Sequence, residues 1–160
     1  MNNGLVIYYS LTGNVEYIAN KLKNDLNFDL CEVKTVFNLR NAGFLKIFLG
    51  VFQVIFKIHP KIIYNNVDFS RYERIIIGTP VWANSFVPAL NKFFKEVKIE
   101  QKKISFFVCC NGGEGNALTD LKNSLSNNSF EENIVFFDAI KNKETTEKTY
   151  NEFISKLKNN

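Results

Sequence analysis

Continuous apolar runs alternate along the chain with segments whose apolar residues recur at helical spacing. The runs predict buried strands at 5–9, 74–78, 104–110 and 134–137, and a shorter, partly alternating edge strand at 30–33. The periodic segments predict helices at 14–26, 87–97, 117–125 and 144–158. This alternation favours an α/β fold with right-handed crossovers and a mainly parallel sheet covered on both faces. Continuous apolar strands agree with it, because both faces of such a sheet are buried.

The size of the chain favours a single domain over residues 1–160. Hydrophobic residues make up 46% of it, and no repeat or low-complexity linker divides it. No apolar run reaches the length of about 18 residues that predicts a transmembrane segment. Residues 1–4 lack the charged region of a signal peptide. Cys109 and Cys110 are adjacent in a predicted strand, where an ordinary disulfide between neighbours is not expected, so we expect buried thiols in a reduced, cytoplasmic protein.

The turn between the first strand and the first helix has the composition of an anion site. Its residues are Ser10, Leu11, Thr12, Gly13, Asn14 and Val15. The first N–H groups of a helix have no partner within the helix and attract negative charge, and hydroxyl and amide side chains add donors. The turn contains no Lys or Arg, so we expect a single phosphate held by neutral donors. Alone, this turn would fit an ordinary helix cap equally well.

Two further loops follow predicted strands, and in a parallel sheet all three loops meet at the carboxyl edge, where ligands bind. Residues 79–85 contain the only Trp of the chain, Trp82. Residues 111–116 contain three glycines, which expose backbone N–H and C=O groups to a flat ligand. Together the three loops favour a phosphorylated, planar aromatic ligand over a simple helix cap.

These motifs resemble the flavodoxin family, which binds FMN. The resemblance rests on Ser-Leu-Thr-Gly-Asn-Val at 10–15, Gly-Thr-Pro-Val-Trp-Ala-Asn at 78–84 and Asn-Gly-Gly-Glu-Gly at 111–115. It implies a three-layer, doubly wound fold with five parallel strands in the order 2-1-3-4-5. It also implies that residues 10–15 hold the phosphate, with Ser10, Thr12, Gly13 and Asn14 as the main contacts. Pro80, Val81, Trp82, Ala83 and Asn84 would pass one side of the flavin ring, and Asn111, Gly112 and Gly113 would line its pyrimidine edge.

Three features depart from that family. Val15 stands where a hydroxyl residue is usual, and the third loop has no aromatic residue to place against the ring. The chain has a net charge of +4, whereas flavodoxins are typically acidic, so the family's usual partners are not carried over.

The expected function is electron transfer by an FMN-binding carrier, which exchanges electrons with a redox partner protein or a small-molecule acceptor. Two alternatives remain open. An FMN-dependent NAD(P)H:quinone oxidoreductase would use the ring face that the third loop leaves open. A flavin-free interaction module would explain Val15. We expect neither a nucleic-acid partner nor catalytic or metal-binding residues.

Other classes lack their defining residues. A triphosphatase needs Gly-Lys-Ser/Thr, a dinucleotide site needs three glycines after the first strand, and a response regulator needs an acidic pair there. A Cys-dependent phosphatase needs an Arg at the end of its loop, where this chain has Gly115 and Asn116. The only histidine, His59, has no cluster around it that would form a metal site.

Residues 43–58 predict an unusually apolar helix. Its small and polar positions, among them Lys46 and Gln53, form one narrow stripe, and residues 34–61 contain basic residues but no acid. A core helix with a long loop is the plain interpretation. A homodimer surface, a lid over the flavin and a patch for an anionic membrane or partner remain open, with dimer or lid ranked above membrane.

Overall fold

The computed structural model describes residues 4–36 and 60–159 and contains a central parallel sheet. Its strands are β1 (Gly4–Tyr8), β2 (Asp29–Glu32), β5 (Arg74–Trp82), β7 (Lys103–Cys110) and β8 (Ser129–Phe137). They pair in the order β2-β1-β5-β7-β8, and each neighbouring pair is parallel. In sequence order this is 2-1-3-4-5, so the predicted fold and strand order are confirmed.

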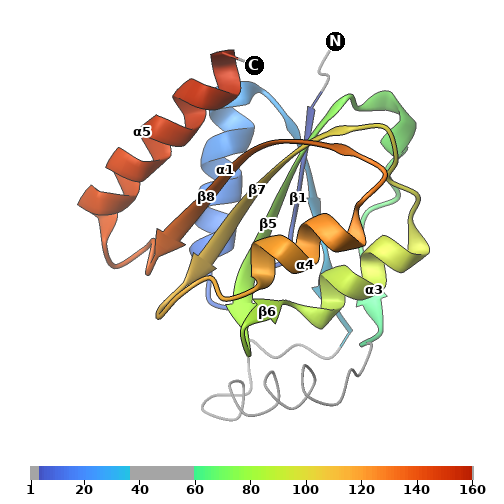
Figure 1. Ribbon diagram of the computed structural model, residues 1–160, viewed down its shortest axis with the longest axis horizontal. Coiled ribbons are helices and arrows are strands. Elements are labelled where there is room, and N and C mark those ends of the chain that lie inside the picture. The colour runs from blue at the N-terminus through green and yellow to red at the C-terminus, as the bar shows by residue number, and fades with distance from the viewer. Residues whose placement is uncertain (1–3, 37–59, 160) are drawn as a thin grey trace.

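Helices cover both faces of the sheet (Figure 1). They are α1 (Asn14–Leu26), α3 (Pro88–Glu96), α4 (Ala117–Ser124) and α5 (Lys143–Asn159). Helices α1 and α5 lie on one face, and α3 and α4 lie on the other. Helix α1 begins and ends as its periodicity predicts, and Val15, Ile18, Ala19 and Leu22 are its buried residues. Pro88 occupies the first turn of α3, where its missing N–H costs no hydrogen bond.

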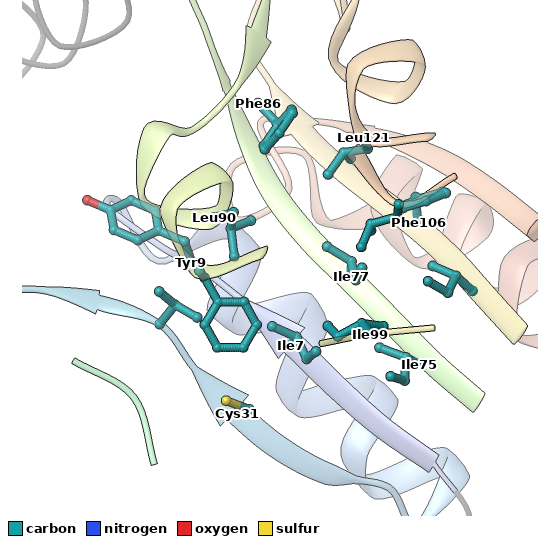
Figure 2. Close-up of a cluster of buried hydrophobic side chains, with 14 of the residues drawn as sticks. Ile7, Tyr9, Cys31, Ile75, Ile77, Phe86, Leu90, Ile99, Phe106 and Leu121 are labelled. Atoms are coloured by element: carbon teal, nitrogen blue, oxygen red, sulfur yellow. The ribbon is translucent and has the colours of Figure 1, made fainter. Parts of the chain in front are cut away.

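The core is divided into two parts by the sheet, because successive residues of a strand point to opposite faces. Ile7 of β1 belongs to the part beneath α3 and α4, whereas its neighbour Val6 belongs to the part beneath α1 and α5. Figure 2 shows the first part, in which Leu90 of α3 and Leu121 of α4 pack over the strand residues. Both faces of β1, β5 and β7 are therefore largely buried, as their continuous apolar runs predicted, whereas Phe136 is the one buried residue of the edge strand β8.

The predicted loop at 79–85 is largely not a loop. Strand β5 continues to Trp82 and pairs antiparallel with a short strand β6 (Ser85–Phe86). Ala83 and Asn84 form the connecting turn with positive φ angles of 43° and 69°. This is the two-residue hairpin turn whose twist matches that of the strands. The second ligand loop is thus a hairpin with a defined backbone.

The structure contains some short elements that the sequence did not predict. The short elements are β3 (Lys34–Thr35), which pairs antiparallel with β4 (Ile62–Ile63), and the 3₁₀ helix η2 (Phe69–Arg71). Strand β8 also begins five residues earlier than predicted, at Ser129 rather than 134. The predicted helix at 43–58 and His59 lie outside the described residues. None of the helices in the described residues is long and apolar enough to span a membrane.

Candidate functional site

A cavity of about 630 Å³ lies at the carboxyl edge of the sheet. Four segments line it, following β1, ending β5, ending β7 and following β8. The lining residues are Leu11, Thr12, Asn14, Val15, Pro80, Val81, Trp82, Ala83, Cys109, Cys110, Asn111, Gly112, Gly113, Asp138, Ile140 and Lys141. Strand β1 lies between β2 and β5, so the chain passes from β1 to β2 on one side and then back to β5 on the other. The cavity lies at the carboxyl edge where this reversal of strand order occurs, which is the usual ligand position in this architecture.

The structure brings the three predicted loops together around this cavity. Of the predicted cofactor residues, all line it except Ser10, Gly13 and Asn84. Those three have supporting positions in the loops. The fourth segment, at 138–141, was not predicted, and Cys109 and Cys110 line the cavity although only their burial was expected.

The first loop is held in shape by its own polar groups. The Oγ of buried Ser10 accepts a hydrogen bond from the N–H of Glu16 at 3.2 Å. Asn14 Nδ2 donates to the Oγ1 of Thr12 at 3.2 Å. Gly13 has φ 93°, a conformation that glycine adopts without strain, and α1 begins immediately after it. The amino end of a 13-residue helix therefore faces the cavity through Asn14 and Val15.

The second loop places the only Trp beside the cavity. The rings of Trp82 and Tyr9 meet edge to face, with centroids 5.7 Å apart and planes at 87°. Buried Thr79 fixes the strand below, since its Oγ1 donates to the carbonyl of Pro80 at 2.8 Å. Trp82 is partly exposed, so a face of a ligand could meet an aromatic side chain here.

The second and third loops are joined to each other. The N–H of Asn116 donates to the carbonyl of Asn84 at 2.7 Å. Ser85 Oγ donates to a carboxylate oxygen of Asp120, on α4, at 2.5 Å. A ligand between these two loops would therefore contact two sides of the cavity that are linked by hydrogen bonds. Asp120 was missed by sequence reasoning, because it lies five residues beyond the glycine-rich stretch and on a helix.

The fourth segment contacts the first loop directly. The N–H of Ile140 donates to the Oδ1 of Asn14 at 2.8 Å. Asp138 and Lys141 are the charged residues that line the cavity within the described part of the chain, and Asp138 Oδ1 lies 3.8 Å from Lys141 Nζ. No glycine or motif marks this segment. Its position directly after the fifth strand, at the same edge as the other loops, was the available signal.

The two thiols at the cavity remain protonated at neutral pH. Burial raises the pKa of Cys109, and the neighbouring Cys110 adds to this rise. Burial also raises the pKa of Cys110, although hydrogen bonds from the N–H groups of Gly113 and Gly112 oppose the rise. Neither thiol is therefore set up as a nucleophile, which needs a lowered pKa.

A family model described as flavodoxin matches residues 3–155 of the chain. The chain belongs to the flavodoxin family. The match covers the sheet, all four helices named above in whole or in most of their length, and the four segments around the cavity. Among curated proteins, none matches this flavodoxin-family chain.

Solved structures support the same fold. A flavoprotein of Lactobacillus acidophilus NCFM in complex with FMN is 20% identical, with a TM-score of 0.73 over 88% of this chain and 97% of that chain. A flavodoxin from the domain Archaea is 14% identical, with a TM-score of 0.56 over 97% of this chain and 98% of that chain. A WrbA-like flavodoxin from Agrobacterium tumefaciens is 17% identical, with a TM-score of 0.52 over 81% of this chain and 76% of that chain. At these identities, the likeness shows the flavodoxin fold.

Proposed function

We propose that this protein binds FMN in the cavity at the carboxyl edge of the sheet and serves as an electron-transfer protein. The observation that carries the proposal is the convergence of three predicted loops on one cavity of about 630 Å³. Cavities that hold small ligands have volumes of roughly 300–1,000 Å³. Membership of the flavodoxin family and the likeness to an FMN complex at 20% identity support the same cofactor.

The first loop suits the phosphate of FMN. Thr12 and Asn14 line the cavity with a hydroxyl and an amide, and α1 begins there with Asn14 and Val15, whose N–H groups have no acceptor within the helix. The amino end of a helix attracts an anion without a cation or a metal. Ser10 would act indirectly, because its Oγ holds the N–H of Glu16 and so fixes the first turn of α1.

The second and third loops suit the flat ring. Trp82 and Val81 give one apolar wall, and Gly112 and Gly113 leave open space, since a β-carbon on either would have no heavy atom within 4 Å. Exposed backbone groups at these glycines can meet the polar edge of a ring. Pro80 to Ala83 and Asn111 to Gly113 would therefore hold the ring between them.

FMN would supply reversible acceptance and donation of electrons, which the side chains of this site do not supply. The titratable residues that line the cavity in the described chain are Cys109, Cys110, Asp138 and Lys141. The pKa of both thiols is raised by burial, so neither offers an acid or base poised near neutral pH. This composition favours a carrier, whose electrons would pass to a partner protein or a small-molecule acceptor. The three cysteines are free thiols, which suits a reduced, cytoplasmic setting.

Titration of the flavin-free protein with FMN tests the proposal. We expect flavin fluorescence to be quenched with saturation at one FMN per chain, because an aromatic wall beside the ring quenches it. Gly112→Val should weaken binding by about tenfold or more, since the new side chain takes space at the cavity while the protein itself has room for it. Ser126→Val, an exposed position in the turn before β8, is the matched control and should bind as the original protein does. Absence of saturable binding to the original protein would contradict the proposal.

The same material separates a carrier from a reductase. A carrier should exchange electrons with chemical reductants but show no saturable oxidation of NADH or NADPH in the presence of a quinone. Saturable turnover with either nucleotide would instead assign the protein to the NAD(P)H:quinone oxidoreductases. Failure to bind FMN would exclude both the carrier and the reductase and would favour the flavin-free interaction module.

A further inference from the structure

The segment after β8 is built against the loop proposed for the phosphate. Besides the hydrogen bond from Ile140 N–H to Asn14 Oδ1 at 2.8 Å, the Ile140 side chain lies against Gly13. A β-carbon added to Gly13 would lie 3.3 Å from Ile140 Cδ1. The next residue, Lys141, therefore leaves the backbone directly beside residues 13–14.

The backbone of this segment is fixed from several sides. Asp138 has φ 47°, and its N–H donates to the carbonyl of Cys110 at 3.1 Å. Its carbonyl accepts the N–H groups of Lys141 at 2.8 Å and Asn142 at 2.9 Å. Thr146 Oγ1, on α5, donates to the carbonyl of Ala139 at 3.0 Å. The position from which the Lys141 side chain projects is thus set by β7 and α5.

Lys141 and Asp138 place charges of opposite sign at this edge of the cavity. The Nζ of Lys141 lies 3.8 Å from Asp138 Oδ1, a loose contact, and the Lys141 side chain is 77% exposed. A loose ion pair with an exposed lysine contributes little to stability, so the Lys141 side chain can turn toward a stronger anion. A phosphate that carries up to two negative charges would attract Lys141 and would be repelled by Asp138.

We propose that Lys141 and Asp138 form an opposed charge pair at the rim of the cavity, which sets how strongly the site prefers a phosphorylated flavin to the same flavin without phosphate. Lys141 supplies the cation that the first loop lacks, and Asp138 limits its effect. The proposal rests on the proposed binding of FMN and goes beyond it, because neutral donors alone would need neither residue.

The test compares dissociation constants for FMN and for riboflavin, which lacks the phosphate, on the same flavin-free preparations. Lys141→Gln should weaken FMN binding by about fivefold and leave riboflavin binding unchanged, so the ratio of the riboflavin constant to the FMN constant falls. Asp138→Asn should strengthen FMN binding by about twofold to threefold and raise the ratio. Asn tolerates the positive φ of residue 138, so this variant keeps the backbone.

Three further measurements test whether the change in this ratio comes from the charges of Lys141 and Asp138. Lys143→Gln removes an exposed lysine two residues away that does not line the cavity, and it should leave the ratio unchanged. Lys141→Arg should retain most of the preference. High salt should reduce the differences between variants, because exposed charges are screened.

The opposite signs for the two variants distinguish this role from a structural one. The inference would be overturned if Lys141→Gln left the ratio unchanged or weakened both flavins equally, or if Asp138→Asn lowered the ratio. Equal binding of FMN and riboflavin by the original protein would also overturn it, while flavin binding itself stood. Binding of neither flavin would defeat the proposed function, and the inference with it.

Discussion

Asn84 occupies the space that a side chain on Gly115 would need. A β-carbon at Gly115 would overlap the amide group of Asn84, and it would also crowd the Asn84 carbonyl. That carbonyl accepts the N–H of Asn116 at 2.7 Å, so the contact joins the second and third ligand loops. Gly115 also has φ 52°, in the left-handed region that glycine favours. A glycine is required here both for space and for backbone conformation.

Gly115→Ala should therefore lower the free energy of unfolding by about 2 kcal/mol, through steric overlap and a strained backbone. Urea denaturation of the flavin-free protein measures this. Gly112→Ala is the matched control, because a β-carbon there meets no atom within 4 Å and its φ is not positive. We expect it to change the free energy by less than about 0.5 kcal/mol. Equal stabilities for the two variants would show that the loops separate easily.

The hydrogen bond from Ser85 to Asp120 should also stabilise the hairpin. It is 2.5 Å long, partly buried and made to a carboxylate, and hydrogen bonds to charged groups contribute roughly 1.5–3 kcal/mol. Ser85→Ala should lower the free energy of unfolding by about that amount. Ser124→Ala on the same helix removes an exposed hydrogen bond to the Asp120 carbonyl and should cost much less. A similar loss in both variants would mean that the hydrogen bond from Ser85 to the Asp120 carboxylate stabilises the protein no more than the exposed hydrogen bond of Ser124 does.

The sequence predicted the elements whose boundaries depend on local periodicity. Helix α1 was predicted to the residue, because its buried positions recur at i, i+3, i+4 and i+7 and Gly13 precedes it. The end of β5 was missed because Thr79-Pro80 resembles a turn. Strand β1 pairs with β5 only as far as Gly78, so Thr79 and Pro80 pair with β7 on one side and with no strand of the described residues on the other. Proline is tolerated there as it is in an edge strand.

The site was predicted where composition is unusual and missed where it is ordinary. The three loops carry glycines, hydroxyl residues or the only Trp, and the cavity forms between them. The segment at 138–141 has none of these features. Its role depends on the contact between Ile140 and Asn14, 126 residues apart, which no local pattern encodes. Asp120 was missed for the same reason, since its partner Ser85 lies 35 residues away.

The contact between α1 and α5 should contribute to stability in a pH-dependent way. Glu147 accepts hydrogen bonds from Lys21 Nζ and Tyr17 Oη, both at 2.9 Å, and these lower its pKa from an ordinary value of 4.5. A carboxylate with a lowered pKa stabilises the fold above its unfolded pKa, and this is lost as pH falls through the folded value. The Glu147 side chain is 43% exposed, so the effect should be below about 1 kcal/mol.

Glu147→Gln should therefore cost stability at pH 7 and progressively less as the pH is lowered to 3 and the original carboxylate takes up a proton. The measurement is the difference in free energy of unfolding between the original protein and the variant at each pH. Glu152→Gln, at an exposed position in the same helix, controls for the loss of a negative charge and should give a smaller change with pH. A cost at pH 3 as large as at pH 7 would show that packing, not charge, holds the helices together.

The three thiols should differ in reactivity according to burial and position. Burial raises the pKa of fully buried Cys31 to about 11. At pH 8 its thiolate fraction is then on the order of one in a thousand, against about a quarter for an ordinary cysteine. Burial raises the pKa of Cys110 as well, but this thiol lines the cavity, and the N–H groups of Gly113 and Gly112 oppose the rise. Cys110 is therefore the thiol that should react first.

Alkylation of the flavin-free protein with iodoacetamide at pH 8, followed by peptide mass spectrometry, measures this order. We expect modification at Cys110 first, and at Cys31 only on unfolding, since reaction needs both the thiolate and access to it. Cys110→Ser should remove the fast phase, while Cys31→Ser should retain it. Alkylation of Cys31 at the rate found in urea would mean that the sheet edge formed by β2 opens readily, because Cys31 lies on that strand.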